Sequence, residues 1–206
     1  MIISMSFYDH ISLMPAYYNG SHINVYRNGL QKRPQLSCFT KGVVMTIELE
    51  FMYEVRAEIG EPQIMGKTPA GIRIMFPVLG GTLRGPALNA EVLPGTSGDW
   101  TTLRPDGSTS LDVRTVCKAE NGDLIYCTYG GRMHAETKEG IALASDMSKP
   151  DPEVGKDQYY LRINPLYETA SETYGWLNKV VAVGTGQTGS IGQGSRGLVY
   201  QVYQVK

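Results

Sequence analysis

The stretch that decides the fold is Glu48-Leu49-Glu50-Phe51-Met52-Tyr53-Glu54-Val55-Arg56-Ala57-Glu58. Apolar and charged side chains alternate along it, and Met52 is the one apolar residue on the charged face. Because successive side chains of a β-strand point to opposite faces, this period of two predicts a strand with one buried face and one solvated face.

The same alternation recurs after this stretch and is interrupted by Gly, Pro, Asn and Asp residues, as expected of turns. Two turns are clear: Pro105 presets φ in Arg104-Pro105-Asp106-Gly107, and Asn121-Gly122 favours a two-residue hairpin. A short helix is expected within 135–147, and a long Gly/Ser/Gln-rich connection over 184–197. The other expected strands are Ile72–Val78, Leu88–Leu93, Trp100–Leu103, Ser110–Lys118, Leu124–Tyr129, Tyr159–Asn164, Gly175–Val183 and Leu198–Val205.

Eight to ten short strands need their sheet edges protected, and closing the sheet removes those edges. The sequence therefore predicts an all-β fold, a closed or nearly closed antiparallel β-barrel, with less than about one-fifth helix against a globular average near one-third. A barrel of about eight strands can hold one small ligand in an internal cavity. The 13 tyrosines against 4 phenylalanines suit such a cavity, because tyrosine combines an apolar ring with a hydrogen-bonding tip.

Residues 1–44 lack clean alternation and are expected to form an N-terminal extension, with the barrel domain over 45–206. The extension contains Ile23, Val25 and Tyr26. Because these side chains are apolar, we expect the extension to pack on the barrel or on a partner subunit.

Composition disfavours several classes of partner. The net charge of −1 gives no electrostatic footprint for nucleic acid or for an anionic membrane. The N-terminus lacks the basic region of a signal peptide, and the three cysteines, Cys38, Cys117 and Cys127, are an odd number without CxxC spacing. We expect a cytoplasmic protein with reduced thiols, no nucleic-acid partner and no membrane partner.

Motifs that suggest cofactors or metals fail in their context. Gly184-Thr185-Gly186-Gln187-Thr188-Gly189 has dinucleotide-binding GxGxxG spacing, but no helix is expected after it. His134-Ala135-Glu136 matches the deaminase HxE without the PCxxC that should accompany it, and the three histidines are too scattered for a zinc site. We therefore expect no metal and no cofactor.

An ordered series of blocks between about Leu49 and Val205 resembles the domain of unknown function numbered 3237 (DUF3237), also called the UPF0311 family. The blocks are Gly80-Gly81-Thr82-Leu83-Arg84-Gly85-Pro86-Ala87-Leu88, Val92-Leu93-Pro94-Gly95, Asp99-Trp100, Arg104-Pro105-Asp106-Gly107, Leu111-Asp112-Val113-Arg114, Tyr159-Tyr160-Leu161-Arg162, Tyr167-Glu168-Thr169 and Tyr174-Gly175-Trp176-Leu177-Asn178.

This resemblance implies a lipocalin-like or AOC-barrel-like β-barrel with a central cavity and no settled activity. Some barrels of this general kind are cofactor-free enzymes of secondary metabolism. The chain departs from the family pattern in residues 1–44, in its longer 184–197 connection, and at Pro165-Leu166, where the family more often has arginine or a similar polar residue.

Four residues are candidates for catalysis. Asp112 and Arg114 share one face of a strand, and they form either a charged pair in the cavity wall or a surface ion pair; the family resemblance favours the inward orientation. Arg162 presents a forked set of donors that suits a carboxylate, phenolate or enolate, unless it lies on an exposed face. Glu168 is the candidate general base, with a turn carboxylate as the alternative.

Aromatic and polar residues near these positions are candidates for substrate binding. The alternative for Trp176 is an ordinary core tryptophan, and for His134 a solvated loop residue. The substrate-binding candidates are Tyr126, His134, Tyr160, Tyr174, Trp176 and Asn178. From their shared strand faces and the family blocks, we expect one interior space to be lined by Asp112, Arg114, Tyr160, Arg162, Tyr174 and Trp176.

Two functions stay open. The first is a cofactor-independent isomerase, lyase or cyclase of secondary metabolism, which would isomerise, eliminate or cyclise (including pericyclic ring closure) an aromatic or polyketide-like substrate in the barrel. The second is a small-molecule binding or carrier protein without catalysis. Either protein could be a homodimer.

Overall fold

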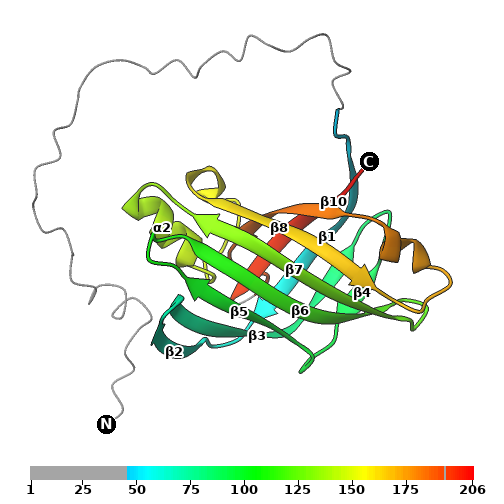
Figure 1. Cartoon of the computed structure of the whole chain (residues 1–206), viewed down its shortest axis with the longest axis horizontal. Helices are drawn as coiled ribbons and strands as arrows, with labels where there is room; N and C mark the ends of the chain where they lie inside the picture. Colours follow the sequence, from blue (N-terminus) through cyan, green and yellow to red (C-terminus); the bar gives the residue numbers. More distant parts are fainter. Residues whose placement is uncertain (1–45, 193) are drawn as a thin grey trace, which may run out of the picture. The chain divides into compact units, whose positions relative to one another are not determined.

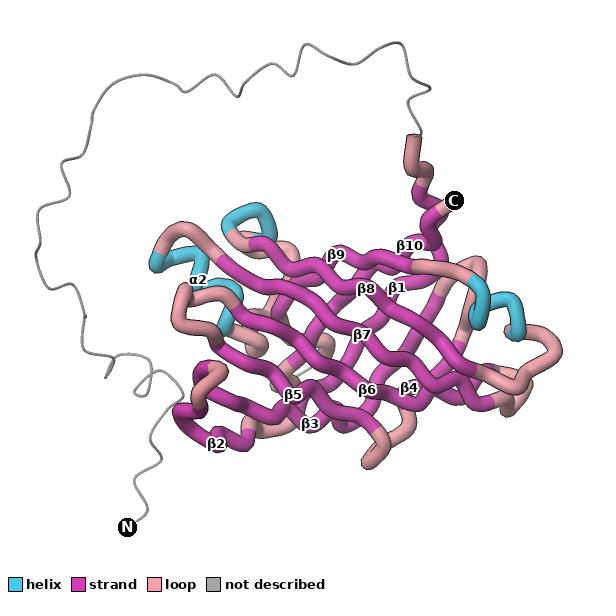
Figure 2. Tube along the Cα trace, viewed as in Figure 1, coloured by secondary structure: helices cyan, strands magenta, loops and turns pink. Residues whose placement is uncertain are grey.

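The computed structural model describes residues 46–192 and 194–206. Ten antiparallel strands form one sheet that wraps into a barrel (Figure 1). The strands are β1 (Leu49–Ile59), β2 (Gln63–Thr68), β3 (Gly71–Arg84), β4 (Ala90–Val92), β5 (Ser97–Leu103), β6 (Thr109–Ala119), β7 (Leu124–His134), β8 (Tyr160–Glu168), β9 (Ala182–Thr188) and β10 (Gly197–Val205). Helix in the described residues is confined to α2 (Lys138–Ser145) and the 3-10 helices η1 (Lys156–Gln158) and η2 (Gly175–Lys179) (Figure 2).

The barrel closes where β3 pairs with β1. From β1 the sheet runs through β10, β9, β8, β7 and β6, and the short strands β4 and β5 together connect β6 to β3. The pairing of β3 with β1 then completes a closed eight-stranded antiparallel barrel. The predicted fold class and low helix content are therefore confirmed.

Met52, the exception in the alternation of β1, marks a β-bulge. The register of β1 against β10 shifts between Phe51 and Tyr53, and the Met52 side chain is fully buried. A bulge inserts one unpaired residue, so that the odd-numbered residues of β1 face inward after it instead of the even-numbered ones. Tyr53 consequently faces the interior, while Phe51, two residues earlier, lies on the outer face against Tyr203.

The predicted strand Gly175–Val183 is wrong in its first half. Gly175–Lys179 forms the 3-10 helix η2, and the strand β9 begins only at Ala182. The side chain of Asn178 explains the bend, because its amide oxygen accepts from the backbone N–H of Thr169 (2.8 Å) and its amide nitrogen donates to the Thr169 carbonyl (2.9 Å).

The predicted connection 184–197 is shorter than expected, because β9 continues to Thr188. Gly184 and Gly186 of the GxGxxG run face the barrel interior within this strand. A Cβ atom at Gly186 would lie 2.5 Å from the Tyr200 ring and 2.7 Å from the Leu161 side chain. These glycines make room for core side chains. The expected packing of residues 1–44 lies outside the described residues.

The closing seam provides the first prediction. A Cβ atom at Gly81, where φ is 155°, would lie 2.4 Å from the Arg56 carbonyl oxygen of β1, whereas one at Gly80 would meet nothing closer than the Val92 carbonyl oxygen at 4.0 Å. We expect Gly81→Ala to lower the free energy of unfolding by about 2–4 kcal/mol, from backbone strain and overpacking. The neighbouring variant Gly80→Ala should change it by less than about 1 kcal/mol. Urea unfolding of both variants tests this, and equal losses would contradict it.

Candidate functional site

A set of polar side chains projects into the barrel interior near its middle. Asp99 of β5 is paired with Phe76 of β3 and lies opposite Val113 of β6, and both apolar partners are buried. Residues directly opposite each other in a sheet share a face. The carboxyl of Asp99 therefore points inward.

Two tyrosines meet inside the barrel beside this carboxyl. Tyr129 of β7 and Tyr200 of β10 are separated in the sheet by β8 and β9, yet their rings pack edge to face with centroids 6.0 Å apart. Such a contact is possible only across the interior. The negative charge of Asp99 contributes to the raised pKa of both tyrosines, which places all three side chains in one cluster.

Burial gives Asp99 an unusual protonation equilibrium. Its side chain is 7% exposed, and this desolvation raises the pKa of the carboxyl to about 6. A backbone hydrogen bond from the Asp112 N–H to Oδ1 (3.0 Å) and hydrogen bonding with the Thr101 side chain stabilise the charged form and limit the rise. A carboxyl that titrates near neutral pH can both accept and return a proton, as general acid–base catalysis requires.

The hydroxyl of Tyr200 is buried without a hydrogen-bond partner among the described residues. The Tyr129 hydroxyl lies close enough to act on Tyr200 as a hydrogen-bonding neighbour and so lowers the pKa of Tyr200, but the two hydroxyls do not reach good hydrogen-bond geometry. Burial has the larger effect and raises the pKa well above its ordinary value. An unsatisfied buried hydroxyl typically costs about 1–3 kcal/mol. Such a group is explained when a ligand or an ordered water completes it.

A second pair of tyrosines also lies in the interior, two residues further along the strands. The hydroxyls of Tyr53 and Tyr167 are 2.5 Å apart, and burial raises the pKa of both. Two thiols lie in the same region: burial raises the pKa of Cys117 to about 11 and that of Cys127 further still. The thiolate is the reactive form of cysteine, so these thiols are unsuited to act as nucleophiles.

Three inward-facing side chains beside these groups are only partly buried. Val55, Thr115 and Tyr129 face inward by strand register, yet each keeps intermediate rather than buried exposure. Tyr129 is at the same time enclosed deeply enough that desolvation is the largest cause of its raised pKa. The inward-facing side chains next to the cluster formed by Asp99, Tyr129 and Tyr200 are therefore less completely covered than the core residues of the same strands.

The strand-borne candidates from the sequence lie on the opposite side of the wall. Leu111 and Val113 take the interior positions of β6, and so the inward orientation expected for Asp112 and Arg114 is wrong. These two form a surface ion pair of 3.1 Å with about half of each side chain exposed. The candidates on this outer face of β6, β7 and β8 are Asp112, Arg114, Tyr126, His134, Tyr160, Arg162 and Glu168.

Within this outer face, His134 stacks on Tyr160 with ring centroids 5.1 Å apart, and the Arg162 guanidinium lies 4.8 Å from the Tyr160 ring centroid. The predicted convergence of Arg114 and Arg162 on the interior is therefore wrong. Glu168 is exposed opposite Tyr126 and does not face the interior.

The remaining candidates gather around η2. Trp176 and Asn178 line an open surface groove of about 800 Å³, together with Lys179 and Gln204. Tyr174 immediately precedes η2. The expected convergence of Tyr174 and Trp176 with the strand residues does not occur, because these residues belong to a 3-10 helix rather than to the barrel wall.

Residues 46–192 and 194–206 contain no group of three or more His, Cys, Asp or Glu side chains placed to hold a metal ion. Within the same residues, no helix has the length and apolar character needed to span a membrane.

Comparisons with known proteins agree with this architecture. The family model described as "Protein of unknown function (DUF3237)" matches residues 47–205. The UPF0311 protein RPA1785 of Rhodopseudomonas palustris is 26% identical over 140 residues, which cover 68% of this chain and 88% of the relative. Its crystal structure superposes with a TM-score of 0.68 at 25% identity, over 79% of this chain and 99% of that one.

Two further proteins are informative. A β-barrel-like protein from Acinetobacter baumannii superposes with a TM-score of 0.63 at 28% identity, over 79% of this chain and 98% of that chain. The hydroalkoxylation enzyme phnH of Penicillium herquei is 26% identical over 137 residues, which cover 66% of this chain and 72% of the relative.

The second prediction concerns pH. The pKa of Asp99 rises from an unfolded value near 3.9 to about 6 in the fold, so between these pH values the folded state binds more protons than the unfolded state. Stability therefore falls as pH rises through this window and stays low above it. Asp99→Asn keeps an acceptor for the Asp112 N–H and removes the charge. We expect it to be more stable than the wild type at pH 8 by up to about 3 kcal/mol, since one pKa unit is about 1.4 kcal/mol.

At pH 4 this difference between Asp99→Asn and the wild type should largely vanish. Urea unfolding at both pH values measures it. A stability difference that is the same at pH 4 and pH 8 would show that Asp99 does not titrate as described.

The third prediction compares two buried tyrosines. Tyr200→Phe removes a hydroxyl without a partner, so the free energy of unfolding should stay level or rise by about 1 kcal/mol. Tyr53→Phe leaves the Tyr167 hydroxyl without its buried partner and should lower the free energy of unfolding by about 1–3 kcal/mol. Thermal or urea unfolding of the pair decides, and a larger loss for Tyr200→Phe would mean that its hydroxyl is already satisfied.

Proposed function

This chain belongs to the family described as "Protein of unknown function (DUF3237)", and we propose that it is a cofactor-independent enzyme that moves a proton on a small molecule bound inside the barrel. The observation that carries the proposal is the buried Asp99 carboxyl, with a pKa of about 6, beside the Tyr200 hydroxyl that has no partner among the described residues. Asp99 is the proposed acid–base group, and Tyr129 and Tyr200 are the proposed hydrogen-bond donors.

The charge balance of the cluster indicates the kind of substrate. The ionisable groups that influence Asp99, Tyr129 and Tyr200 are all acids: aspartate, tyrosine and cysteine. An anionic ligand would find no counter-charge from these groups, and burying an unpaired charge is strongly unfavourable. The aromatic rings instead favour a neutral, flat, largely apolar molecule with a hydroxyl or carbonyl group.

The cluster suits the addition of an O–H group across a carbon–carbon double bond conjugated to a carbonyl. The Asp99 carboxylate accepts the proton of the substrate hydroxyl while the oxygen of that hydroxyl bonds to the alkene carbon. Tyrosine hydroxyls donate to the enolate oxygen that forms, as donors placed at developing charge do in other enzymes. Asp99 then returns the proton to the neighbouring carbon, so no co-reactant is consumed. Run in reverse the steps are an elimination, and proton removal and return alone are an isomerisation.

The similarity to the Penicillium protein supports this class of reaction. That relative is named a hydroalkoxylation enzyme, and hydroalkoxylation is the addition of an alcohol O–H across a double bond. The other relatives reported above carry no activity in their names. The substrate of this chain is proposed to be aromatic or polyketide-like, and the reaction to belong to secondary metabolism.

The fourth prediction uses 2′-hydroxychalcone, a neutral aromatic enone whose cyclisation to flavanone is an intramolecular hydroalkoxylation. We expect the wild type to accelerate ring closure above the buffer rate, and kcat/KM to rise with pH through about 6 as Asp99 becomes ionised. Loss of an acid–base group costs about a hundred- to ten-thousandfold in rate. Asp99→Asn should fall within that range, and Tyr200→Phe should lose less while remaining folded.

The matched control is Glu58→Gln, an exposed carboxylate on β1 that should keep the wild-type rate. Asp112→Asn tests the outer wall directly. A greater loss from Asp112→Asn than from Asp99→Asn would place the chemistry outside the barrel. Tight binding of the chalcone by the wild type with no acceleration would favour the carrier over the enzyme.

A further inference from the structure

We propose that the outer wall of the barrel carries a separate oxyanion-binding site, centred on Arg132 and Arg162. These arginines are direct cross-strand partners on β7 and β8, and both side chains are exposed on the outer face. Like charges placed directly opposite each other destabilise a sheet. Their juxtaposition is understandable if an anion lies between them.

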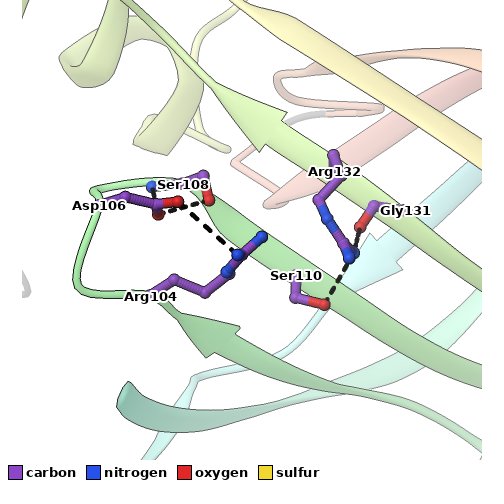
Figure 3. Close-up of polar contacts among 6 residues, drawn as sticks. All are labelled: Arg104, Asp106, Ser108, Ser110, Gly131 and Arg132. Carbon is purple, nitrogen blue, oxygen red and sulfur yellow. Dashed lines mark hydrogen bonds and ion pairs between the residues drawn. The ribbon is translucent and has the colours of Figure 1, made fainter. Parts of the chain in front are cut away.

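No carboxylate among the described residues neutralises this pair. The nearby acidic side chains have other neighbours: Asp112 pairs with Arg114, Asp106 with Arg104, and Glu136 lies 3.6 Å from His134 Nδ1. Figure 3 shows Arg104 directed to Asp106 on the turn between β5 and β6, while Arg132 reaches toward Ser110. Two guanidinium groups therefore share one stretch of wall without a counter-charge from the described part of the chain.

Both guanidinium groups are held in place by neutral contacts. Arg132 donates to Ser110 Oγ (2.9 Å) and to the Gly131 carbonyl (2.8 Å). Arg162 donates to the Leu161 carbonyl (2.8 Å) and lies over the Tyr160 ring, on which His134 also stacks. Tyr160 is therefore a positioning residue for Arg162. Because these hydrogen bonds all use Nη1, the other N–H groups of the Arg132 and Arg162 guanidinium groups remain available to a ligand.

Hydroxyl groups extend the row on both sides. Ser110 of β6 is paired with Arg132, and Thr185 of β9 is paired with Arg162. The outer face thus presents a row of Ser110, Arg132, Arg162 and Thr185 across four adjacent strands. Two arginines flanked by hydroxyls match the donor set that recognises phosphate and carboxylate oxygens.

This site differs from the interior cluster in the ligand it would take. The interior cluster is acidic and suits a neutral molecule, whereas the outer row is cationic and suits a phosphate or carboxylate group. The two lie on opposite sides of the same wall, since Leu161 and Ile163 face inward between the outward side chains of β8.

The test is a titration with inorganic phosphate, and with acetate as the carboxylate probe, at ionic strength held constant with sodium chloride. We expect phosphate to raise the melting temperature of the wild type where chloride does not. Hydrogen bonds to charged groups contribute about 1.5–3 kcal/mol, so Arg132→Gln and Arg162→Gln should each weaken phosphate binding at least about tenfold by calorimetry. Tyr160→Ala should weaken it less, and Tyr160→Phe should leave it unchanged.

The matched control is Arg56→Gln, which removes an exposed arginine that pairs with Glu54 (2.8 Å) on β1 and should keep the wild-type phosphate affinity. Without phosphate and at low salt, Arg132→Gln and Arg162→Gln should melt at or above the wild-type temperature, because each removes like-charge repulsion. Equal effects of phosphate and chloride, an equal loss in Arg56→Gln, or lower melting of both glutamine variants at low salt would overturn the proposal. Stronger binding of acetate than of phosphate would identify the ligand group as a carboxylate.

Discussion

The pairing of β1 with β3 is the interaction on which the rest of the structure depends. It requires the two backbones to approach closely where β3 passes β1: a Cβ atom at Gly85 would lie 2.3 Å from the Met52 carbonyl oxygen, and one at Gly81 would be almost as close to the Arg56 oxygen. Without this seam, β1 and β3 would be open edges and the sheet would enclose nothing. The raised pKa of Asp99 is a consequence of the closure, because desolvation is its largest cause and a carboxyl on an open sheet would stay solvated.

In a closed barrel, alternate side chains along each strand face the interior and the outer surface. On β8, the alternating pattern places Leu161, Ile163 and Tyr167 inside and leaves Tyr160 and Arg162 outside. The same rule separates two chemistries over a single layer of backbone, with the Asp99 carboxyl and its tyrosines within the barrel and the guanidinium groups of Arg132 and Arg162 on its outer surface. A one-residue change of register would exchange these sets completely, so strand register determines the chemistry of each surface as firmly as residue identity does.

Alternation along the sequence was sufficient to predict the barrel and most of its strands, because burial of one face leaves a period-two pattern. It did not predict β2, whose side chains are mostly exposed, and it placed strand where η2 forms. The alternation also indicated the correct orientation of β6 and β8. In the alternating stretches of these strands, every second residue is apolar and faces the interior, as in Leu111, Val113, Leu161 and Ile163. The inward orientation of Asp112 and Arg114 rested on family resemblance and conflicted with the cost of burying charges. Asp99 could not be identified in this way. It lies in Ser97-Gly98-Asp99-Trp100, where neither set of alternate residues is consistently apolar. Only its pairing with Phe76 and Val113 shows that it faces inward.

The interior cluster is a place where the fold forgoes stability. A buried carboxyl that contacts the Asp112 N–H and the Thr101 side chain, beside a phenol without a well-formed hydrogen bond, would be replaced by apolar side chains if packing were the only requirement. Tyr129 faces inward in the same cluster and keeps intermediate exposure, so it is less completely covered than the fully buried Tyr200. Incomplete polar satisfaction and incomplete coverage at the same position are costs that a bound molecule of the right shape would offset together. The coincidence of the two is the physical reason to regard this cluster, rather than the more conspicuous arginines outside, as the reacting centre.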